Sequence, residues 1–244
     1  MIFDNYLHAF LDLFYPRSCL HCKRNLNNSC EFYLCNDCKG QISYLDNTQC
    51  IRCGAVPGPY TVLSTKGCSA CKGKYLHFDT IVAVAYYEGV MRTLLHAFKY
   101  GRQRFLFMML NDIILQNKKL YDIVPEIDII VPVPLYWLKN FHRGFNQSEL
   151  LSKGIQRHFL KPVSINNLYR IRNTSSQTQL SKTQRQVNIH DAFIVKHTKQ
   201  LRGKKILLVD DVLTTGVTAA ECSKKLKEAG VQSVHLLVLA IAIL

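Results

Sequence analysis

Two adjacent carboxylates near the end of the chain are the first residues whose chemistry stands out. Asp210 and Asp211 follow an apolar run within the sequence ILLVDDVLTTGVT, residues 206–218. Ionised carboxylates accept hydrogen bonds and donate none, so two of them at a strand end can hold a vicinal diol such as that of a ribose ring. Like charges side by side repel, and a diol that bridges them makes the pair tolerable.

The residues after this acid pair indicate a site for an anion. Residues 213–218 lead into a predicted helix, and the free backbone N–H groups and threonine hydroxyls there can bind a phosphate. Gly216 lets the backbone approach closely or adopt a positive φ. Carboxylates for a diol and N–H groups for a phosphate together predict a site for a ribose 5-phosphate.

Other phosphate-binding and acidic motifs fit less well. Neither G-x-G-x-x-G after a strand nor G-x-x-x-x-G-K-[ST] occurs in the chain. ILLVDD resembles the first strand of a response-regulator receiver domain, which would need four more strand–helix units, whereas only one helix and one strand remain. A solvated acidic turn is the other interpretation.

Eight cysteines in four C-x-x-C pairs predict metal binding. Two residues between thiolates let both sulfurs point at one ion, and two such pairs complete a tetrahedral, structural zinc site with no position open for water. The predicted ligands of one or two Zn²⁺ ions are Cys19, Cys22, Cys35, Cys38, Cys50, Cys53, Cys68 and Cys71. A redox C-x-x-C normally comes singly and beside a βαβ unit.

The spacing leaves the pairing of these cysteines open. The first pair could share an ion with the second, or a cross-braced order could join the first pair with the third. Cys30 is a spare thiol that could substitute in one site, and Cys222 is expected to be a buried small residue. The segment has little core of its own and should need the metal to fold.

The charge of the chain is concentrated in one segment. The formal net charge is +14, and residues 139–205 contain 14 lysines and arginines against two acids, which gives +12. This imbalance favours a polyanionic partner such as clustered phosphates or a nucleic acid, although a solvated basic surface is the alternative. Two Cys₄ zinc sites would lower the total to about +10 and leave residues 1–78 near −1.

The order of elements predicts an α/β fold with a parallel sheet in residues 77–244, after an N-terminal helix and double zinc-ribbon domain in residues 1–76. Asn146 is expected to cap a helix with Glu149 as its partner. Residues 1–15 predict an amphipathic helix, packed on its own domain or lying on a membrane surface. We expect no membrane span, and without a signal peptide we expect a cytoplasmic protein. The predicted strands are 80–88, 127–135, 204–212 and 231–244, and the predicted helices are 89–101, 104–117, 146–160 and 218–230.

These motifs together resemble a known family. ILLVDDVLTTGVT resembles the phosphoribosyl-pyrophosphate (PRPP) motif of type I phosphoribosyltransferases. Four zinc knuckles, PVPLYWLKNFHRGFNQSELL and NTSSQTQLSKTQRQVNIHDAF resemble the ComF family of competence proteins. The resemblance implies a phosphoribosyltransferase-like fold and a role in natural transformation, with PRPP and single-stranded DNA as ligands. A DNA-uptake helicase or processing protein is an implied partner.

The resemblance also assigns roles. Asp210 and Asp211 would bind the ribose hydroxyls, and Asp211 is the nearest candidate for a base. Mg²⁺ would accompany PRPP. Lys99, Arg143 and Asn146 are candidates for the diphosphate, and residues 173–188, with Lys182 and Arg185, for a lid, against a plain surface loop. The full PRPP loop would be Asp210, Asp211, Val212, Leu213, Thr214, Thr215, Gly216, Val217 and Thr218.

Three functions fit these expectations. The chain could be a DNA-uptake factor that binds PRPP and single-stranded DNA, or a phosphoribosyltransferase with an unidentified acceptor. It could also be an adaptor whose zinc ribbons bind another protein and whose PRPP site is vestigial. A pocket that selects a nucleobase is not recognisable in the sequence.

Overall fold

A parallel four-stranded sheet forms the centre of the computed structural model, which describes residues 17–26, 32–45, 49–58, 61–64, 67–71, 73, 76–101, 103–173 and 189–242. Its strands are β3 (Thr80–Tyr86), β4 (Ile129–Pro132), β7 (Lys205–Leu213) and β8 (Ser233–Ile241), in the order β3-β8-β7-β4. The two central strands are almost continuous apolar runs because both of their faces are covered.

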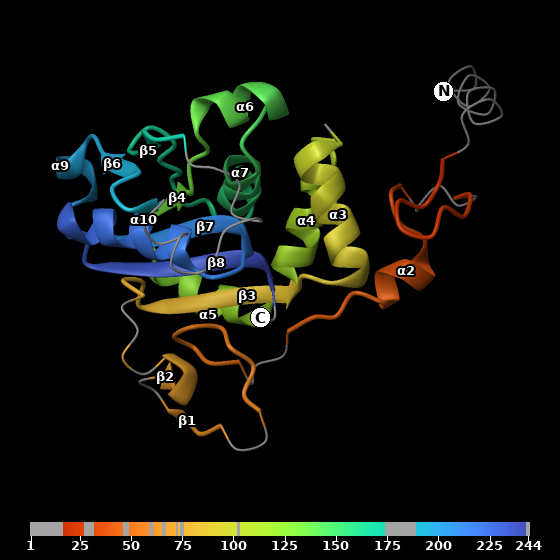
Figure 1. Cartoon of the computed structure of the whole chain (residues 1–244), viewed down its shortest axis with the longest axis horizontal. Helices are drawn as coiled ribbons and strands as arrows, with labels where there is room; N and C mark the ends of the chain where they lie inside the picture. Colours follow the sequence, from red (N-terminus) through yellow and green to blue (C-terminus); the bar gives the residue numbers. More distant parts are fainter. Residues whose placement is uncertain are drawn as a thin grey trace.

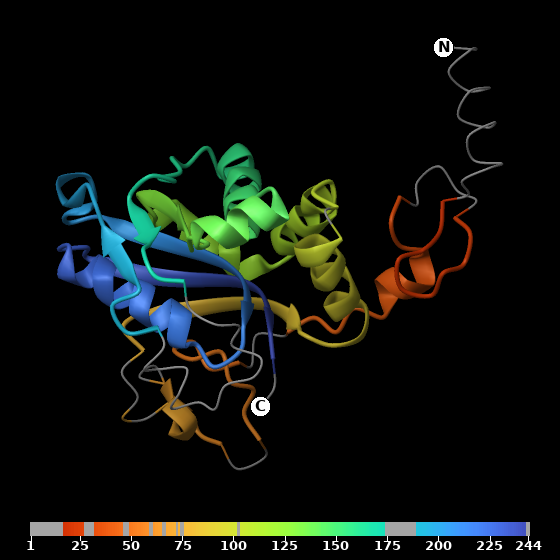
Figure 2. The same ribbon diagram turned by 45° about the horizontal axis from the view of Figure 1, so that its top comes forward.

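Helices cover the sheet on both sides (Figures 1 and 2). Leu207 and Val209 belong to the core that includes α3 (Gly89–Tyr100), α4 (Leu106–Leu115) and α7 (Gln147–Phe159). Ile206 and Leu208 belong to a second core with α10 (Val217–Glu228) and the hairpin of β5 (Leu168–Arg170) and β6 (Phe193–Val195). Alternate residues of β7 thus serve opposite faces, as the pleat of a strand requires.

Several short elements account for the differences between the predicted and the observed element boundaries. Asn117 caps a new helix, α5 (Lys118–Ile123), so the helix predicted for 104–117 is α4 alone. The turn η2 (Val124–Glu126) follows α5, and β4 ends at Pro132, since prolines cannot donate to a ladder. The helices α6 (Trp137–Arg143) and α9 (Thr198–Leu201), the latter just before β7, are not among the predicted elements.

The two cysteine-rich segments lie beside the sheet domain. The first contains α2 (Asn36–Gly40), and the second contains β1 (Leu63–Ser64), β2 (Gly67–Cys68) and the turn η1 (Ser69–Cys71). Between them the chain runs along β3: Leu45 N–H donates to Val84 O, and Tyr86 N–H donates to Ser43 O. This contact covers an exposed sheet edge, which would otherwise be open to pairing with another chain.

The α/β fold class with its parallel sheet is confirmed, whereas the domain boundary at residues 76 and 77 stays a prediction. The helix predicted for residues 1–15 and the spare thiol Cys30 lie outside the described residues. Within the described part of the chain, no helix combines the length and the apolarity that a bilayer crossing requires.

Helix α7 packs closely on α4, and the contact is tight at Gly154. A Cβ atom on Gly154 would overlap the side-chain amide of Asn111, which is buried and donates to Phe107 O. We therefore expect Gly154→Ala to lower the free energy of unfolding by about 1–3 kcal/mol, the usual cost of overpacking. Chemical denaturation would measure the change. Gly40→Ala is the control, because a Cβ there meets open space; equal stability of the two variants would contradict this prediction.

Candidate functional site

The acid pair lies inside the central strand β7, near its carboxyl end, and not in the loop that follows it. Asp210 is paired in register with Val238 of β8, and the strand continues to Leu213. Successive side chains of a strand point to opposite faces, so the two carboxylates have separate partners. This arrangement divides the site into two halves that share one stretch of backbone.

Asp211 forms an ion pair with Lys99 from the last turn of α3. The Nζ atom of Lys99 lies 2.9 Å from Oδ1 of Asp211, and the two side chains are 17% and 11% exposed. Burial alone would lower the pKa of Lys99, but the charge and hydrogen bond of Asp211 outweigh it and raise the pKa above its usual value. The ion pair therefore neutralises one of the two adjacent carboxylates.

Asp210 is held by hydrogen bonds, and among the described residues no cation forms an ion pair with it. Its Oδ1 accepts from the Ser148 hydroxyl at 3.1 Å and from the backbone N–H of Asp211 at 2.9 Å. Burial, together with the negative charge of Asp211, raises the pKa of Asp210 to about 7. The acid pair thus carries between one and two negative charges at neutral pH.

The loop that follows has the form of an anion site. Gly216, at φ 76°, is the N-cap of α10, and the first turn of any helix leaves backbone N–H groups without helical partners. The hydroxyl oxygen of Thr215 is buried and has no hydrogen-bond partner in the described structure. A buried hydroxyl without a partner is costly, and this one lies at the start of a helix, where free backbone N–H groups can bind an anion. Val217 and Thr218 begin α10 itself.

The predicted diphosphate residues lie close by, but they already have structural contacts. Arg143 ends α6, donates to the Gln147 side chain at 3.0 Å and lies 5.1 Å over the ring of Tyr100. Asn146 caps α7 by accepting from Ser148 N–H, and its amide donates to Val133 O. The predicted cap at Asn146 is correct, whereas Glu149 contacts Lys153 in place of the cap.

Sequence reasoning did not single out two further cations in this part of the domain, Arg170 close to Asp210 and Lys139 close to Arg170 and Arg143. Burial lowers the pKa of Arg170 on β5, while the negative charge of Asp210 opposes this shift. Burial also lowers the pKa of Lys139 on α6, and the charges of Arg170 and Arg143 add to the effect. Both residues belong to the basic segment 139–205, whose charge predicted an anionic partner. Which of its cations lie close together could not be predicted, because that depends on the fold.

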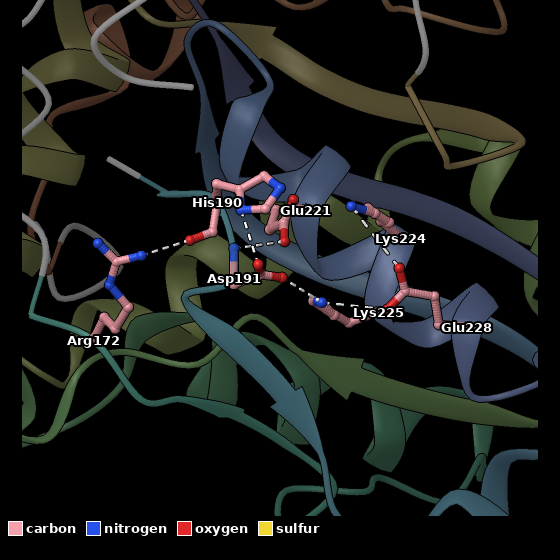
Figure 3. A network of polar contacts seen from close by, with 7 residues as sticks. All are labelled: Arg172, His190, Asp191, Glu221, Lys224, Lys225 and Glu228. Carbon is pink, nitrogen blue, oxygen red and sulfur yellow. Dashed lines mark hydrogen bonds and ion pairs between the residues drawn. The ribbon is translucent and has the colours of Figure 1, made fainter. Parts of the chain in front are cut away.

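The ends of the predicted lid lie close together on α10. Arg172 donates to His190 O at 2.8 Å, Asp191 N–H donates to the Glu221 carboxylate, and Lys225 pairs with Asp191 at 2.7 Å (Figure 3). The chain therefore leaves and returns beside the helix that carries the anion loop. Residues 174–188, with Lys182 and Arg185, lie outside the described residues.

The eight cysteines form two separate clusters that follow the sequential order. Within each cluster the sulfurs lie within 4.8 Å of one another; the members are Cys19, Cys22, Cys35 and Cys38 in one and Cys50, Cys53, Cys68 and Cys71 in the other. Sulfur pairs at 3.6–3.9 Å match the edge of a tetrahedron with Zn–S bonds of about 2.3 Å. The geometry therefore fits two structural zinc ions and differs from the cross-braced order.

The thiols within a cluster differ in pKa. Burial would raise the pKa of Cys19, but backbone N–H groups around it prevail and lower the pKa to about 6. The pKa of Cys38 is raised by burial and by its thiol neighbours. A divalent cation removes this conflict, because it stabilises all four thiolates together.

The two parts of the chain match two known sequence families. Residues 152–242 match the phosphoribosyl transferase domain, and residues 10–72 match the double zinc ribbon domain. The fold and the site therefore define a phosphoribosyltransferase-type domain that follows two zinc ribbons.

Relatives over nearly the whole length give the family. The chain is 32% identical over 232 residues to the competence protein F of Haemophilus influenzae, covering 91% of this chain and 96% of that protein. It is 30% identical over 205 residues to the DNA utilization protein YhgH of Escherichia coli K12, covering 83% and 87%. The competence protein ComFC of Bacillus subtilis is 26% identical over 215 residues, with coverage of 84% and 83%. The chain belongs to this family of competence and DNA utilization proteins.

Solved structures resemble the chain only in part. Glutamine PRPP amidotransferase from B. subtilis is 21% identical, and the match covers 62% of this chain but 26% of that one, with a TM-score of 0.35.

The cysteine clusters predict two zinc ions per chain. Cys38→Ser should lower the zinc content to about one ion and destabilise the first ribbon, because one ligand of a closed site is lost. Metal analysis of the purified protein would measure the content. Cys222→Ala, outside both clusters, should keep both ions, and an unchanged content in Cys38→Ser would contradict the prediction.

The raised pKa of Asp210 predicts a pH-dependent cost to stability. A carboxyl with a folded pKa of about 7 binds its proton more tightly in the native state, so it destabilises the fold as pH rises from about 4 to 7. Asp210→Asn should therefore stabilise the protein by about 2 kcal/mol more at pH 8 than at pH 5. Denaturant unfolding at both values tests this, with the exposed Asp122→Asn as control; a gain that does not grow with pH would disprove it.

Proposed function

We propose that this protein binds PRPP, or a related ribose 5-phosphate, at residues 210–218 and handles single-stranded DNA during natural transformation. The buried hydroxyl of Thr215, without a partner in the described structure and placed at the start of α10, carries the first half of this proposal. It sits within the threonine loop that directly follows two carboxylates. A phosphate oxygen is the partner that this hydroxyl lacks.

The acid pair provides the other end of the ligand site. Asp210 and Asp211 are acceptors for the ribose hydroxyls, and Lys99 sets the negative charge they present. Lys99 and Arg143 lie where a diphosphate would meet positive charge, and Arg170 and Lys139 add to it. Acids and cations close together in one site suit a ligand that carries both a diol and phosphates.

Mg²⁺ fits this site as a companion of the ligand. Carboxylates are oxygen donors that Mg²⁺ prefers, but Asp211 already pairs with Lys99 and Asp210 is close to half protonated at neutral pH. The acid pair alone is therefore a weak dication site. The diphosphate would supply the remaining oxygens, and the ion would neutralise its charge.

Binding is better supported than transfer to an acceptor. Asp211, the candidate base, is already engaged in an ion pair with Lys99. We therefore propose PRPP as a bound ligand of the DNA-handling protein. The relatives named for competence and DNA utilization, and the net charge of +12 in residues 139–205, support the DNA half of the proposal.

Removal of one hydroxyl tests the ligand site. Thr215→Val keeps the shape of the side chain and should weaken the binding of Mg²⁺–PRPP by roughly ten- to a hundredfold, since a hydrogen bond to a charged phosphate is lost. The same change should leave stability equal or higher, because a buried hydroxyl without a partner disappears. Isothermal titration calorimetry and thermal unfolding would measure the two effects.

The control for this variant is Thr198→Val at the exposed start of α9, which should alter neither property. Wild-type protein that does not bind PRPP, or a Thr215→Val variant that binds as tightly as wild type, would show that the phosphate is not held at Thr215.

A further inference from the structure

An apolar groove lies where the first zinc ribbon meets helix α4. Its volume is about 680 Å³, which is enough room for several large side chains. Phe32, Tyr33 and Ile42 line it from the ribbon, and Met108 and Ile113 line it from α4. Figures 1 and 2 show α2, the helix of this ribbon, on the side of the sheet domain that α3 and α4 occupy.

Several side chains of the groove are left in water. Phe32 is 63% exposed, Met108 is 52% exposed and Tyr44 is 42% exposed, and all three line the groove. Burial of apolar surface drives folding, so large apolar side chains that gather in one exposed groove indicate a binding partner.

The charges and the shape of the groove limit what can occupy it. Its charged lining residues are Lys39 and Asp112, which balance each other. A nucleic acid requires a surplus of cations, and a flat membrane surface does not enter a groove. An amphipathic helix that directs its apolar side chains inward suits this site.

The first residues of the chain supply a segment of this kind. The helix predicted for residues 1–15 places its large apolar side chains at the spacing i, i+4, i+7, i+8 and i+11, which puts them on one side. These side chains are Phe3, Leu7, Phe10, Leu11 and Phe14. Neither the ligand loop nor the zinc sites assign a role to them.

This segment is attached to the chain close to the groove. Leu20 N–H donates to the backbone oxygen of Tyr33 at 2.9 Å, and Tyr33 lines the groove. Five residues separate the end of the predicted helix from Leu20, and they reach at most roughly 18 Å. A helix of 15 residues is about 22 Å long, whereas the α4 wall from Met108 to Gln116 extends over about 12 Å. The segment can therefore reach the groove and fill its length.

We propose that residues 1–15 dock in this groove of their own chain and tie the first zinc ribbon to α4. Docking buries the apolar side of the segment and the exposed side chains of the groove in one step. A tethered segment also has a high effective concentration, which favours it over a free partner of the same kind. The inference concerns a part of the molecule away from the ligand loop and does not depend on the proposed function.

A photo-crosslink in the full-length chain tests the docking directly. With p-benzoylphenylalanine in place of Met108, ultraviolet light should join α4 to residues 1–15. Trypsin releases these partners as the single peptides 1–17 and 105–118, because neither contains an internal lysine or arginine. Mass spectrometry should find the two peptides joined, in a product with the mass of one chain. The control is p-benzoylphenylalanine in place of Phe141, which is 80% exposed on α6 and should give no such pair.

Two charge-matched variants test the apolar side of the segment. Leu7→Asp/Leu11→Asp places two charges on that side and should reduce the crosslinked fraction at least about tenfold, because two leucines can no longer be buried. It should also raise the fluorescence of the dye 1-anilinonaphthalene-8-sulfonate, since the groove becomes open to it. Asn5→Asp/Ala9→Asp adds two charges with the same spacing on the opposite side and should change neither signal.

The remaining outcomes would overturn the docking. A joined product with the mass of two chains would assign the groove to the first residues of a second copy. A crosslink in Leu7→Asp/Leu11→Asp as strong as in wild type, or equal dye fluorescence of the two double variants, would show that the apolar side does not occupy the groove. Absence of the crosslink, with wild-type protein bound to vesicles of anionic phospholipid, would assign the segment to a membrane surface.

Discussion

The ion pair between Lys99 and Asp211 is the interaction on which the site depends. Two neighbouring carboxylates at the end of a buried strand repel each other, and burial increases the cost of their charge. Lys99 neutralises the charge of Asp211, and the raised pKa of Asp210 reduces the negative charge of that carboxylate at neutral pH. The structure can thus keep two acids side by side near the end of a buried strand.

The surrounding elements hold the groups that this acid pair needs. The last turn of α3 presents Lys99, and the start of α7 presents Ser148 to Asp210. Asn146 links the start of α7 to Val133, directly after β4, and so holds the start of the helix beside the end of the strand. Close packing of Gly154 on Asn111 fixes α7 against α4. The site is therefore positioned by elements of secondary structure, with a loop only where a phosphate would approach.

Local chemistry was predictable from the sequence, and long-range contacts were not. The acid pair, the threonine loop and the cap at Asn146 follow from residue types over a few positions. The partner of Asp211 comes from a helix 112 residues earlier, and the approach of Arg170 to Asp210 requires the β5–β6 hairpin, so neither has a local signal. Helix α6 was missed because it buries no residue and shows no apolar period. The order of the cysteine clusters depended on backbone paths that equal C-x-x-C spacings do not distinguish.

A run of contacts joins the acid pair to the end of helix α6. Lys99 pairs with Asp211, the next residue Tyr100 lies under Arg143, and Arg143 ends the exposed helix α6. Lys99 cannot leave Asp211 without exposing that carboxylate to the repulsion of Asp210, because no other described cation forms an ion pair with Asp211. The contact between Tyr100 and Arg143 keeps a second cation at the same corner, so the charge balance of the acid pair depends on where α3 and α6 end.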